Sequence, residues 1–311
     1  MSPEGLLTIG ELAERAGVTV KTVRFYSDRG LLPATTRSSG GHRRYGPEAL
    51  DRLRLIRSLR ALDLPVPEVG RVLDQGDGLT GALEDAVDGQ LRALGSQLTA
   101  LRWREAALRL IRDCPAEDRA DRLRLVGAVS TPPSTAALAR FWRGALPVRL
   151  SPRLVSSILD YAVPRPPADP TPAQVLTFAR LHAIATAPCP AGDPRRAAGN
   201  RTDVVRHPDV LYDGLFDAYT LAAAGLKADR TPERGQALDC FVAAHADARG
   251  LPDSPGFRRR LSGMLARGTD PLIDRYWELT GELTSSPEPT LGAVHAWLRS
   301  ALHTDVTTRA G

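Results

Sequence analysis

The stretch TIGELAERAGVTVKTVRFYSDRGLLP, residues 8–33, decides the fold of the N-terminal part of this chain. Thr8 and Glu11 have the spacing of a capping box, in which each side chain satisfies a backbone N–H of the other residue. Apolar residues then recur at helical spacing as far as Gly17, which favours the end of a helix. We therefore expect a short first helix between Thr8 and Gly17.

A second short helix is expected from Val20 to Arg29, with Thr19 as its N-cap. The apolar side chains expected to face inward are Val20, Val23 and Tyr26, and the outward polar ones are Lys21, Thr22 and Arg24. Two short helices joined by a tight turn, the second basic on its outer face, are typical of a helix-turn-helix that reads DNA.

The sequence SSGG at residues 38–41 predicts a tight turn between short strands at 35–37 and 42–45. This hairpin is rich in arginine, and a basic hairpin beside a helix-turn-helix forms a wing. Two further helices are expected at 47–62 and 67–73. Together these elements predict a winged helix-turn-helix DNA-binding domain over residues 1–76.

The net positive charge of the chain is concentrated in this domain. Residues 1–60 contain eleven Lys and Arg against six Asp and Glu, which accounts for the whole formal net charge of +5. The rest of the chain is balanced, so the field that attracts a polyanion belongs to the N-terminal end. The localised charge favours DNA as a partner over a merely solvated helix face.

A single long helix is expected after this domain, over residues 80–112. Its apolar residues recur at spacings of three and four, at Leu83, Val87, Leu91, Leu94, Leu98, Leu101, Leu108 and Ile111. A helix of about 33 residues is about 50 Å long, so one small domain cannot cover such a seam. We expect residues 79–113 to form an antiparallel dimerisation coiled coil in a homodimer.

The sequence beyond Cys114 consists of helical patterns separated by prolines, without the alternation of period two that predicts strands. Helices are expected at 134–144, 152–162, 172–187, 203–224, 231–248, 255–267, 270–284 and 290–303. The expected fold class is therefore mainly α: a winged helix-turn-helix, a long antiparallel dimerisation helix, and an all-α effector-binding domain over residues 120–311.

The composition excludes several classes of protein. Cys114, Cys189 and Cys240 are too few and too widely spaced for a disulfide framework, a soft-metal site or an iron–sulfur cluster, so neither a metal nor a cofactor is expected. No apolar stretch approaches 18 residues and no signal sequence begins the chain, which predicts a cytoplasmic protein without membrane association. Phosphate-loop, zinc-protease and nucleophile-elbow motifs are missing, so no catalytic residues are expected.

The residues just described resemble the MerR family of transcriptional regulators. The resemblance lies in the string Thr8–Tyr26, in GLLP at residues 30–33 and in GHRRY at residues 41–45, and it covers roughly residues 7–75. It implies that the residues approaching the major groove are Thr19, Lys21, Thr22 and Arg24, and that Tyr26 lies near the DNA backbone.

The same resemblance implies that Arg43 and Tyr45 of the wing touch flanking phosphates, with Arg44 beside them. The family often has two tyrosines where this chain has Phe25 and Tyr26, and an acidic residue where Ser27 stands. One hydroxyl that would meet a phosphate is therefore missing.

The resemblance further implies a mechanism. Dimers of this family bind a pseudo-palindromic promoter in which the spacer between the two hexamers is too long for RNA polymerase to engage both. An effector makes the dimer distort the double-stranded DNA until RNA polymerase can engage them. Such a deformation costs about 1–6 kcal/mol, so differential effector binding can decide whether it occurs. RNA polymerase is then an indirect partner, reached through the DNA.

The effector is expected to be a small, hydrophobic molecule, because apolar pockets lined by aromatic residues are the usual small-molecule sites. The candidate effector-binding residues are Trp142, Tyr276, Trp277 and Trp297. The all-α C-terminal domain resembles the thiopeptide-sensing TipA type of this family in class only. Two alternatives stay open, in which this domain binds a protein partner or a further dimer, or modifies a small molecule.

Overall fold

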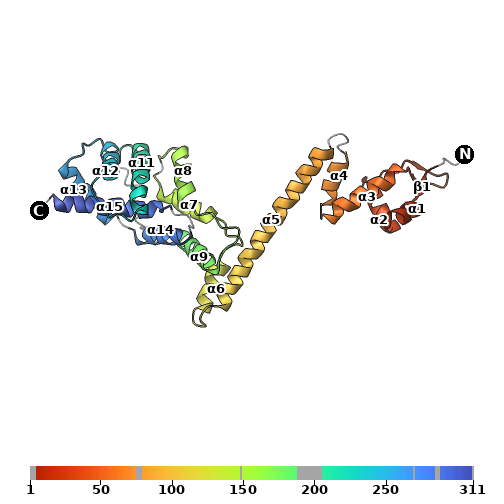
Figure 1. Ribbon diagram of the computed structural model, residues 1–311, viewed down its shortest axis with the longest axis horizontal. Helices are drawn as coiled ribbons and strands as arrows, with labels where there is room; N and C mark the ends of the chain where they lie inside the picture. The colour runs from red at the N-terminus through yellow and green to blue at the C-terminus, as the bar shows by residue number, and fades with distance from the viewer. Residues whose placement is uncertain are drawn as a thin grey trace. The chain divides into compact units, whose positions relative to one another are not determined.

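The computed structural model describes residues 5–74, 79–147, 149–187, 205–268, 270–283 and 288–309. The fold is mainly helical, as predicted (Figure 1). The chain divides into two compact units, Met1–Leu98 and Thr99–Gly311. None of the described helices combines the length and the apolar character needed to cross a membrane.

The N-terminal unit begins with the predicted helix-turn-helix. Its elements are β1 (Leu7–Thr8), α1 (Ile9–Ala16), α2 (Val20–Asp28), β2 (Thr36–Arg37), β3 (Arg43–Tyr45), α3 (Glu48–Ala61) and α4 (Val66–Asp74). The capping box is confirmed, since Thr8 N donates to Glu11 Oε2 at 2.7 Å and Glu11 N donates to Thr8 Oγ1 at 3.2 Å. Gly17 ends α1 with a left-handed φ of 63°, which glycine adopts without strain.

The wing is a three-stranded sheet rather than a two-stranded hairpin. Strand β3 lies in the middle, and both β1 and β2 pair with it in antiparallel register. The sequence did not predict β1, because two residues are too few to show an alternating pattern. This third strand joins the wing directly to the start of α1.

The core of the N-terminal unit consists of side chains that are completely shielded from solvent, among them Leu12, Val23, Leu32, Tyr45, Leu53 and Ile56. The prediction that Val20 faces inward is wrong, since it is 40% exposed. Val20 occupies the first turn of α2, before the helix contacts its neighbours, so helical spacing alone misplaced it.

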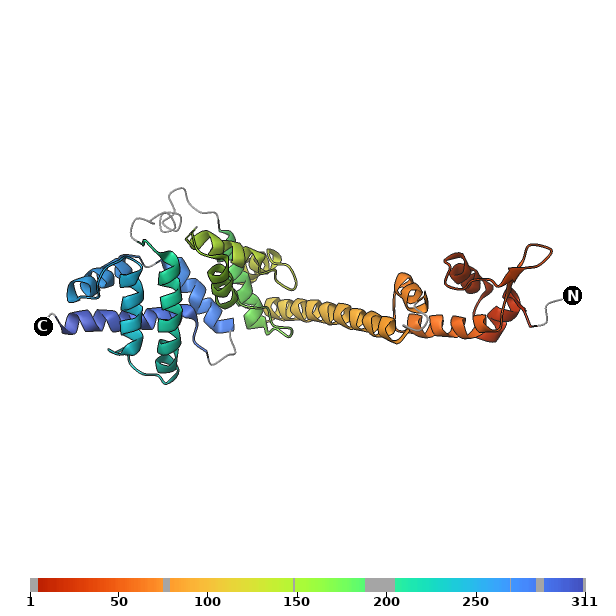
Figure 2. The same cartoon turned by 90° about the horizontal axis from the view of Figure 1, so that it is seen from above.

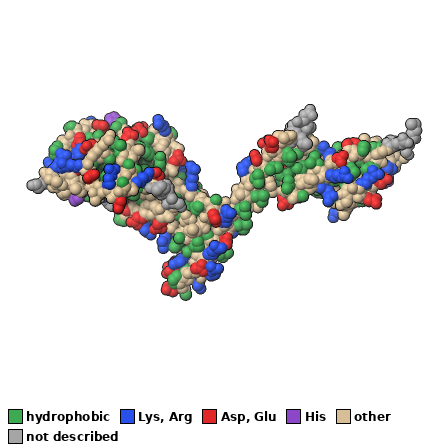
Figure 3. Space-filling model, in the orientation of Figure 1, with side chains coloured by type: hydrophobic (Ala, Val, Ile, Leu, Met, Phe, Trp, Pro, Cys, Tyr) green, Lys and Arg blue, Asp and Glu red, His purple; other side chains and the backbone are tan. Residues whose placement is uncertain are grey.

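Helix α5 (Leu79–Arg112) confirms the predicted long helix. Four leucines of the predicted seam are between 44% and 61% exposed: Leu91, Leu94, Leu98 and Leu101. Figure 3 shows hydrophobic side chains along the visible part of this helix. Near its end α5 buries a different set, with Trp103 Nε1 donating to Pro167 O at 3.0 Å. The seam is therefore an uncovered apolar stripe in the single chain.

The C-terminal unit is all-α over the residues that the structure describes. Its helices are α6 (Arg119–Gly127), α7 (Ala136–Ala145), α8 (Pro152–Ala162), α9 (Pro172–Thr186), α11 (Pro208–Lys227), α12 (Gln236–Asp247), α13 (Pro255–Arg267), α14 (Pro271–Leu283) and α15 (Leu291–Thr308). All eight predicted segments contain a helix. Helix α6 was not predicted, because it buries none of its residues and so carries no apolar stripe.

Two hydrophobic cores hold this unit together. The first contains the end of α5 with α7, α8, α9 and α14, and the second contains α11, α12, α13 and α15. Helix α15 contacts α11, α12, α13 and α14, and Figure 2 shows it running along the unit past α11 and α12. Residues from both cores therefore come together where α11, α14 and α15 meet.

Candidate DNA interface and effector cavity

The outer face of α2 presents cations to solvent. Thr19 caps the helix by accepting from Thr22 N at 3.1 Å, and the two threonine hydroxyls lie 2.9 Å apart. Lys21 and Arg24 are exposed on the following turn. This face matches the predicted reading surface, with Tyr26 buried behind it at 9% exposure.

Phe25 adds an apolar element to this face. It is 42% exposed, and the Arg29 guanidinium lies 5.0 Å from the centre of its ring. A cation over an aromatic face is held mainly by the ring quadrupole. The end of α2 thus carries the Arg29 cation over Phe25, the residue that stands where the resembling family often has a tyrosine.

The wing is attached to α2 by two of the residues expected to touch phosphates. Arg43 and Tyr45 lie two apart on β3 and therefore on one face of the sheet. Arg43 Nη1 donates to Asp28 Oδ1 at 2.6 Å, and the Tyr45 hydroxyl donates to Ser27 Oγ at 3.2 Å. The hydrogen bond to Asp28 raises the pKa of Arg43 above its usual value.

Both residues predicted to touch phosphates are thus engaged within the domain. Tyr45 is 0% exposed, so in this conformation its hydroxyl serves the core rather than a phosphate. The charge of Arg43 is neutralised by Asp28. Ser27, which stands where the family usually has an acid, supplies the partner of the Tyr45 hydroxyl.

The wing carries three further basic side chains besides Arg43. Arg44 lies on the opposite face of β3 from Arg43, and Arg37 and His42 are exposed at the turn. These residues are free of ion pairs within the described part of the chain. Their side chains are therefore available for other contacts.

Three arginines of α3 serve the fold instead of a ligand. Arg52 Nε donates to Leu31 O at 2.7 Å, Arg57 Nη1 donates to Ala16 O at 2.5 Å, and Arg60 donates to Leu64 O. Each one binds a carbonyl at the end of a helix or turn, where such groups lack a helical partner. Part of the positive excess of residues 1–60 is thus structural, which counting charges did not reveal.

The C-terminal unit contains a cavity of about 210 Å³ where α7, α8, α11, α14 and α15 meet. We call it the effector cavity, because two of the residues predicted to bind an effector, Trp142 and Trp277, line it. Its aromatic lining residues are Trp142, Tyr212, Phe216, Tyr219, Trp277 and His295, and aliphatic lining comes from Leu146, Ile158, Leu215, Ile273 and Leu291. Most of these residues lie far apart in the sequence.

The four predicted effector residues separate into three groups. Trp142 and Trp277 line the effector cavity, with ring centres 5.0 Å apart. Tyr276 lies behind them, 0% exposed, and its hydroxyl donates to Ala162 O at 2.7 Å. Trp297 lies outside the cavity, where its Nε1 donates to Arg230 O at 3.0 Å.

The polar groups that line the effector cavity, apart from Asp274 and Arg299, are neutral at pH 7. Burial, reinforced by the charge of Arg299, lowers the pKa of His295 to about 4. Its Nδ1 lies 2.8 Å from the Tyr219 hydroxyl, and burial raises the pKa of that phenol. Burial also raises the pKa of Tyr212 to about 12. No local motif in the sequence marks His295.

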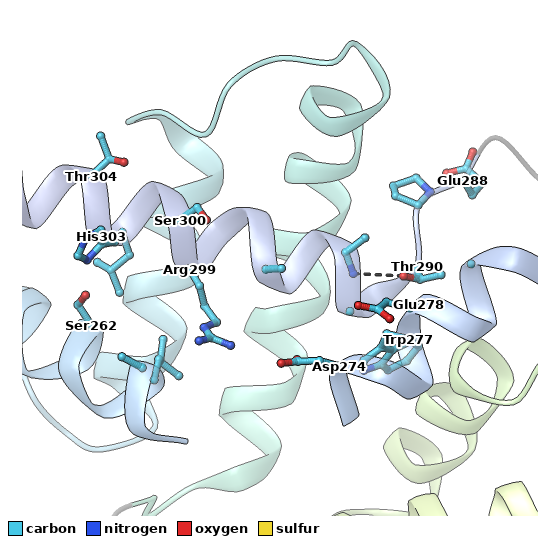
Figure 4. A pocket seen from close by; sticks show the side chains of 18 residues that line it. Ser262, Asp274, Trp277, Glu278, Glu288, Thr290, Arg299, Ser300, His303 and Thr304 are labelled. Atoms are coloured by element: carbon cyan, nitrogen blue, oxygen red, sulfur yellow. Dashed lines mark hydrogen bonds between the residues drawn. The ribbon is translucent and has the colours of Figure 1, made fainter. Parts of the chain in front are cut away.

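A larger open groove of about 950 Å³ adjoins the effector cavity. Five residues line both spaces and so form the mouth between them: Asp274, Trp277, Gly292, Ala296 and Arg299. Figure 4 shows the Asp274 and Arg299 side chains reaching toward each other across this mouth. Charged side chains thus appear at the mouth and in the outer groove, and not deeper inside.

The cysteines do not come together within the described residues. Cys114 is buried, with its thiol against Ile111 O at 3.2 Å, and Cys240 is partly buried. Cys189 lies outside the described residues. In the part of the chain that the structure describes, no three His, Cys, Asp or Glu side chains form a group that could hold a metal ion.

Comparisons with known proteins agree with the geometry of the N-terminal unit. Residues 7–76 match the family described as MerR HTH family regulatory protein. Over 75 residues the chain is 45% identical to the nodulation protein NolA of Bradyrhizobium sp. strain NC92, which covers 24% of this chain and 32% of that protein. It is 48% identical over 67 residues to the HTH-type transcriptional activator TipA of Streptomyces coelicolor. These residues make up 22% of this chain and 26% of that protein.

A third relative is the mercuric resistance operon regulatory protein of Serratia marcescens, 42% identical over 72 residues that make up 23% of this chain and 50% of that protein. The chain thus spans half or less of the length of each of these relatives. Helix-turn-helix geometry, wing and sequence agree over the same residues. Residues 7–76 of this chain are a helix-turn-helix domain of the MerR family.

Proposed function

We propose that this protein is a DNA-binding transcriptional regulator that binds double-stranded promoter DNA as a homodimer. The observation that carries the proposal is the exposed basic face of α2, in a domain whose relatives are named as transcriptional regulators. Lys21, Thr22 and Arg24 read the major groove from this face. Arg37, His42 and Arg44 bind phosphates from the wing.

The dimer forms through the exposed leucines of α5. Four of them lie on one stripe, and contiguous exposed apolar surface of this kind marks an interaction site. Antiparallel pairing with a second copy covers the stripe and joins two reading heads, as a pseudo-palindromic operator requires. An effector bound in the C-terminal unit then changes how strongly the dimer distorts the promoter for RNA polymerase.

The test begins with selection of a preferred duplex from a random DNA pool by the full-length protein. Lys21→Ala and Arg24→Ala should change the preference among sequences, whereas Arg44→Ala should weaken all duplexes alike and reduce the salt dependence. Arg259→Ala, an exposed arginine of the C-terminal unit, is the control. Unchanged binding by the α2 variants would disprove the assignment of the reading face.

The dimer has its own test. Leu94→Asp combined with Leu98→Asp should give a monomer by sedimentation, because charges would be buried in the paired seam. Asp substitution at Leu123, an exposed leucine of α6, is the control. A dimer that survives the double substitution would place the dimer interface elsewhere.

A further inference from the structure

The size of the effector cavity limits its ligand. An engineered protein cavity of about 150 Å³ with apolar walls holds benzene, and drug-sized ligands occupy roughly 300–1,000 Å³. At about 210 Å³ the effector cavity fits more than one ring but less than a drug-sized molecule. The ligand therefore has one or two fused rings inside the cavity.

The walls favour a flat aromatic molecule. Trp142 from α7 and Trp277 from α14 lie on one side, and Tyr212 and Phe216 from α11 line the cavity as well. Aromatic pairs prefer offset stacking or edge-to-face contact, which a planar ligand can make with several rings at once. Aliphatic side chains complete the lining.

The lining also excludes a charge inside the cavity. The residues that line the cavity but not its mouth are uncharged, since His295 stays neutral at pH 7. A buried ion without a partner is strongly unfavourable. Any charged substituent must therefore lie at the mouth, beside Asp274 and Arg299, or in the outer groove.

One buried donor in the lining, within the described residues, lacks an acceptor. Trp142 is 8% exposed, and its Nε1 makes no hydrogen bond among the described residues. The indole lies near the Tyr276 phenol and partly opposes the rise that burial causes in its pKa. The Tyr276 hydroxyl donates to Ala162 O and could still accept, but no hydrogen bond from Trp142 Nε1 reaches it. A ligand acceptor would satisfy a donor that the protein leaves unpaired.

We propose that the effector cavity binds an uncharged, planar aromatic molecule of one or two fused rings with a hydrogen-bond acceptor, and that Trp142 Nε1 donates to this acceptor. The ligand lies between the aromatic side chains of α7, α11 and α14. Its role as the effector rests on the proposed function, but its binding does not require DNA.

The experiment measures binding of three probes to the full-length protein without DNA, by calorimetry and tryptophan fluorescence. Coumarin is planar, uncharged and carries a carbonyl acceptor; naphthalene has the same shape without an acceptor; 2-naphthoate adds a charge. Coumarin should bind about fivefold more tightly than naphthalene, and 2-naphthoate should bind more weakly than both. No saturable binding of coumarin, or equal affinity for all three, would overturn the proposal.

Matched variants locate the site. Trp142→Phe keeps the ring and removes the donor, so it should weaken coumarin about fivefold and leave naphthalene unchanged. Trp297→Phe is the control, because its indole N–H is bonded outside the cavity. Ala145→Phe should fill the cavity and abolish binding of both probes, whereas Ala136→Phe on the exposed face of the same helix should not. Equal effects of the two tryptophan variants would refute the assigned donor.

A DNA-binding measurement separates this inference from the proposed function. Loss of probe binding with intact DNA binding would refute the ligand class and leave the regulator standing. Probe binding to a protein that shifts no selected duplex would support the cavity and refute the regulatory role.

Discussion

Asp28→Asn should increase both the affinity of this protein for DNA and the dependence of that affinity on salt. Asp28 holds the Arg43 guanidinium at 2.6 Å, and the two side chains are 53% and 30% exposed. An ion pair this exposed contributes little to stability, so its loss should leave the fold intact. The substitution frees one cation of the wing to meet a phosphate.

The size of the change in salt dependence follows from the release of counterions when a cation meets a phosphate. Each phosphate contact adds about 0.9 to the slope of log K against log salt, so raising salt fourfold, for example from about 50 to 200 mM, costs about 3.5-fold in affinity per contact. Asp28→Asn should steepen the slope by about 0.9 per protomer, and Arg44→Ala should reduce it by about as much. Arg43→Ala should leave the slope unchanged, because Asp28 already neutralises that charge.

The assay is fluorescence anisotropy of a selected duplex over this salt range. The Asp28→Asn, Arg43→Ala double variant is the control, because removing an acidic side chain from the interface also reduces repulsion. The gain in slope should disappear in the double variant. A slope that falls with Arg43→Ala alone while Asp28→Asn changes nothing would refute the reasoning, since Arg43 would then already bind a phosphate.

Two further predictions concern the C-terminal unit, which contains all four tryptophans and can be followed by their fluorescence. Asp305→Asn should lower its free energy of unfolding by about 3 kcal/mol in urea titrations, because the 0% exposed carboxylate of Asp305 accepts from Arg258 at 3.2 Å and from Arg309 at 3.1 Å. The control is Glu278→Gln, which breaks an exposed pair with Arg275 and should lower the free energy of unfolding by less than about 1 kcal/mol. Similar losses for the two variants would contradict the role of burial. Burial lowers the pKa of His245 to about 3 and that of His295 to about 4, so both stay neutral in the folded state while the unfolded chain binds protons near pH 6.5. The free energy of unfolding should therefore be highest above pH 6.5 and fall toward pH 4, by about 1.3 kcal/mol per histidine between about pH 7.5 and 5.5. His295→Asn should remove about half of this pH-dependent loss. A free energy of unfolding that does not change with pH would show that these histidines are not buried in the neutral form.

The helices of this chain could be predicted because their signals are local. A capping box, a left-handed glycine and apolar residues at spacings of three and four lie within one helix, so α1 and α5 could be located to within a residue or two. Helix α6 escaped because it buries nothing. Local signals also located α2 and predicted which of its side chains are exposed.

The roles of single side chains depended on contacts that no local pattern contains. Arg43 and Arg44 are neighbours of the same type, yet the alternation of β3 sends them to opposite faces, and only Arg43 finds Asp28. Whether the odd or the even residues of a strand face the core depends on its register with β1 and β2. The family resemblance named the correct wing, and the register decided which of its cations remains available.

The effector cavity shows the same limit at a larger scale. Composition made tryptophan a reasonable candidate, but Trp142, Trp277 and Trp297 look alike along the sequence and separate only in space. Gly292 helps to set where one of them lies: a Cβ at this position of α15 would stand 2.1 Å from Trp277 Cγ, a distance that real side chains do not reach. The absence of a side chain on α15 therefore lets the Trp277 ring lie against that helix, at the mouth of the cavity. A glycine inside a helix ordinarily lowers stability by about 0.5–1 kcal/mol relative to alanine, and here that cost is offset by the contact between α14 and α15 that carries Trp277 into the site.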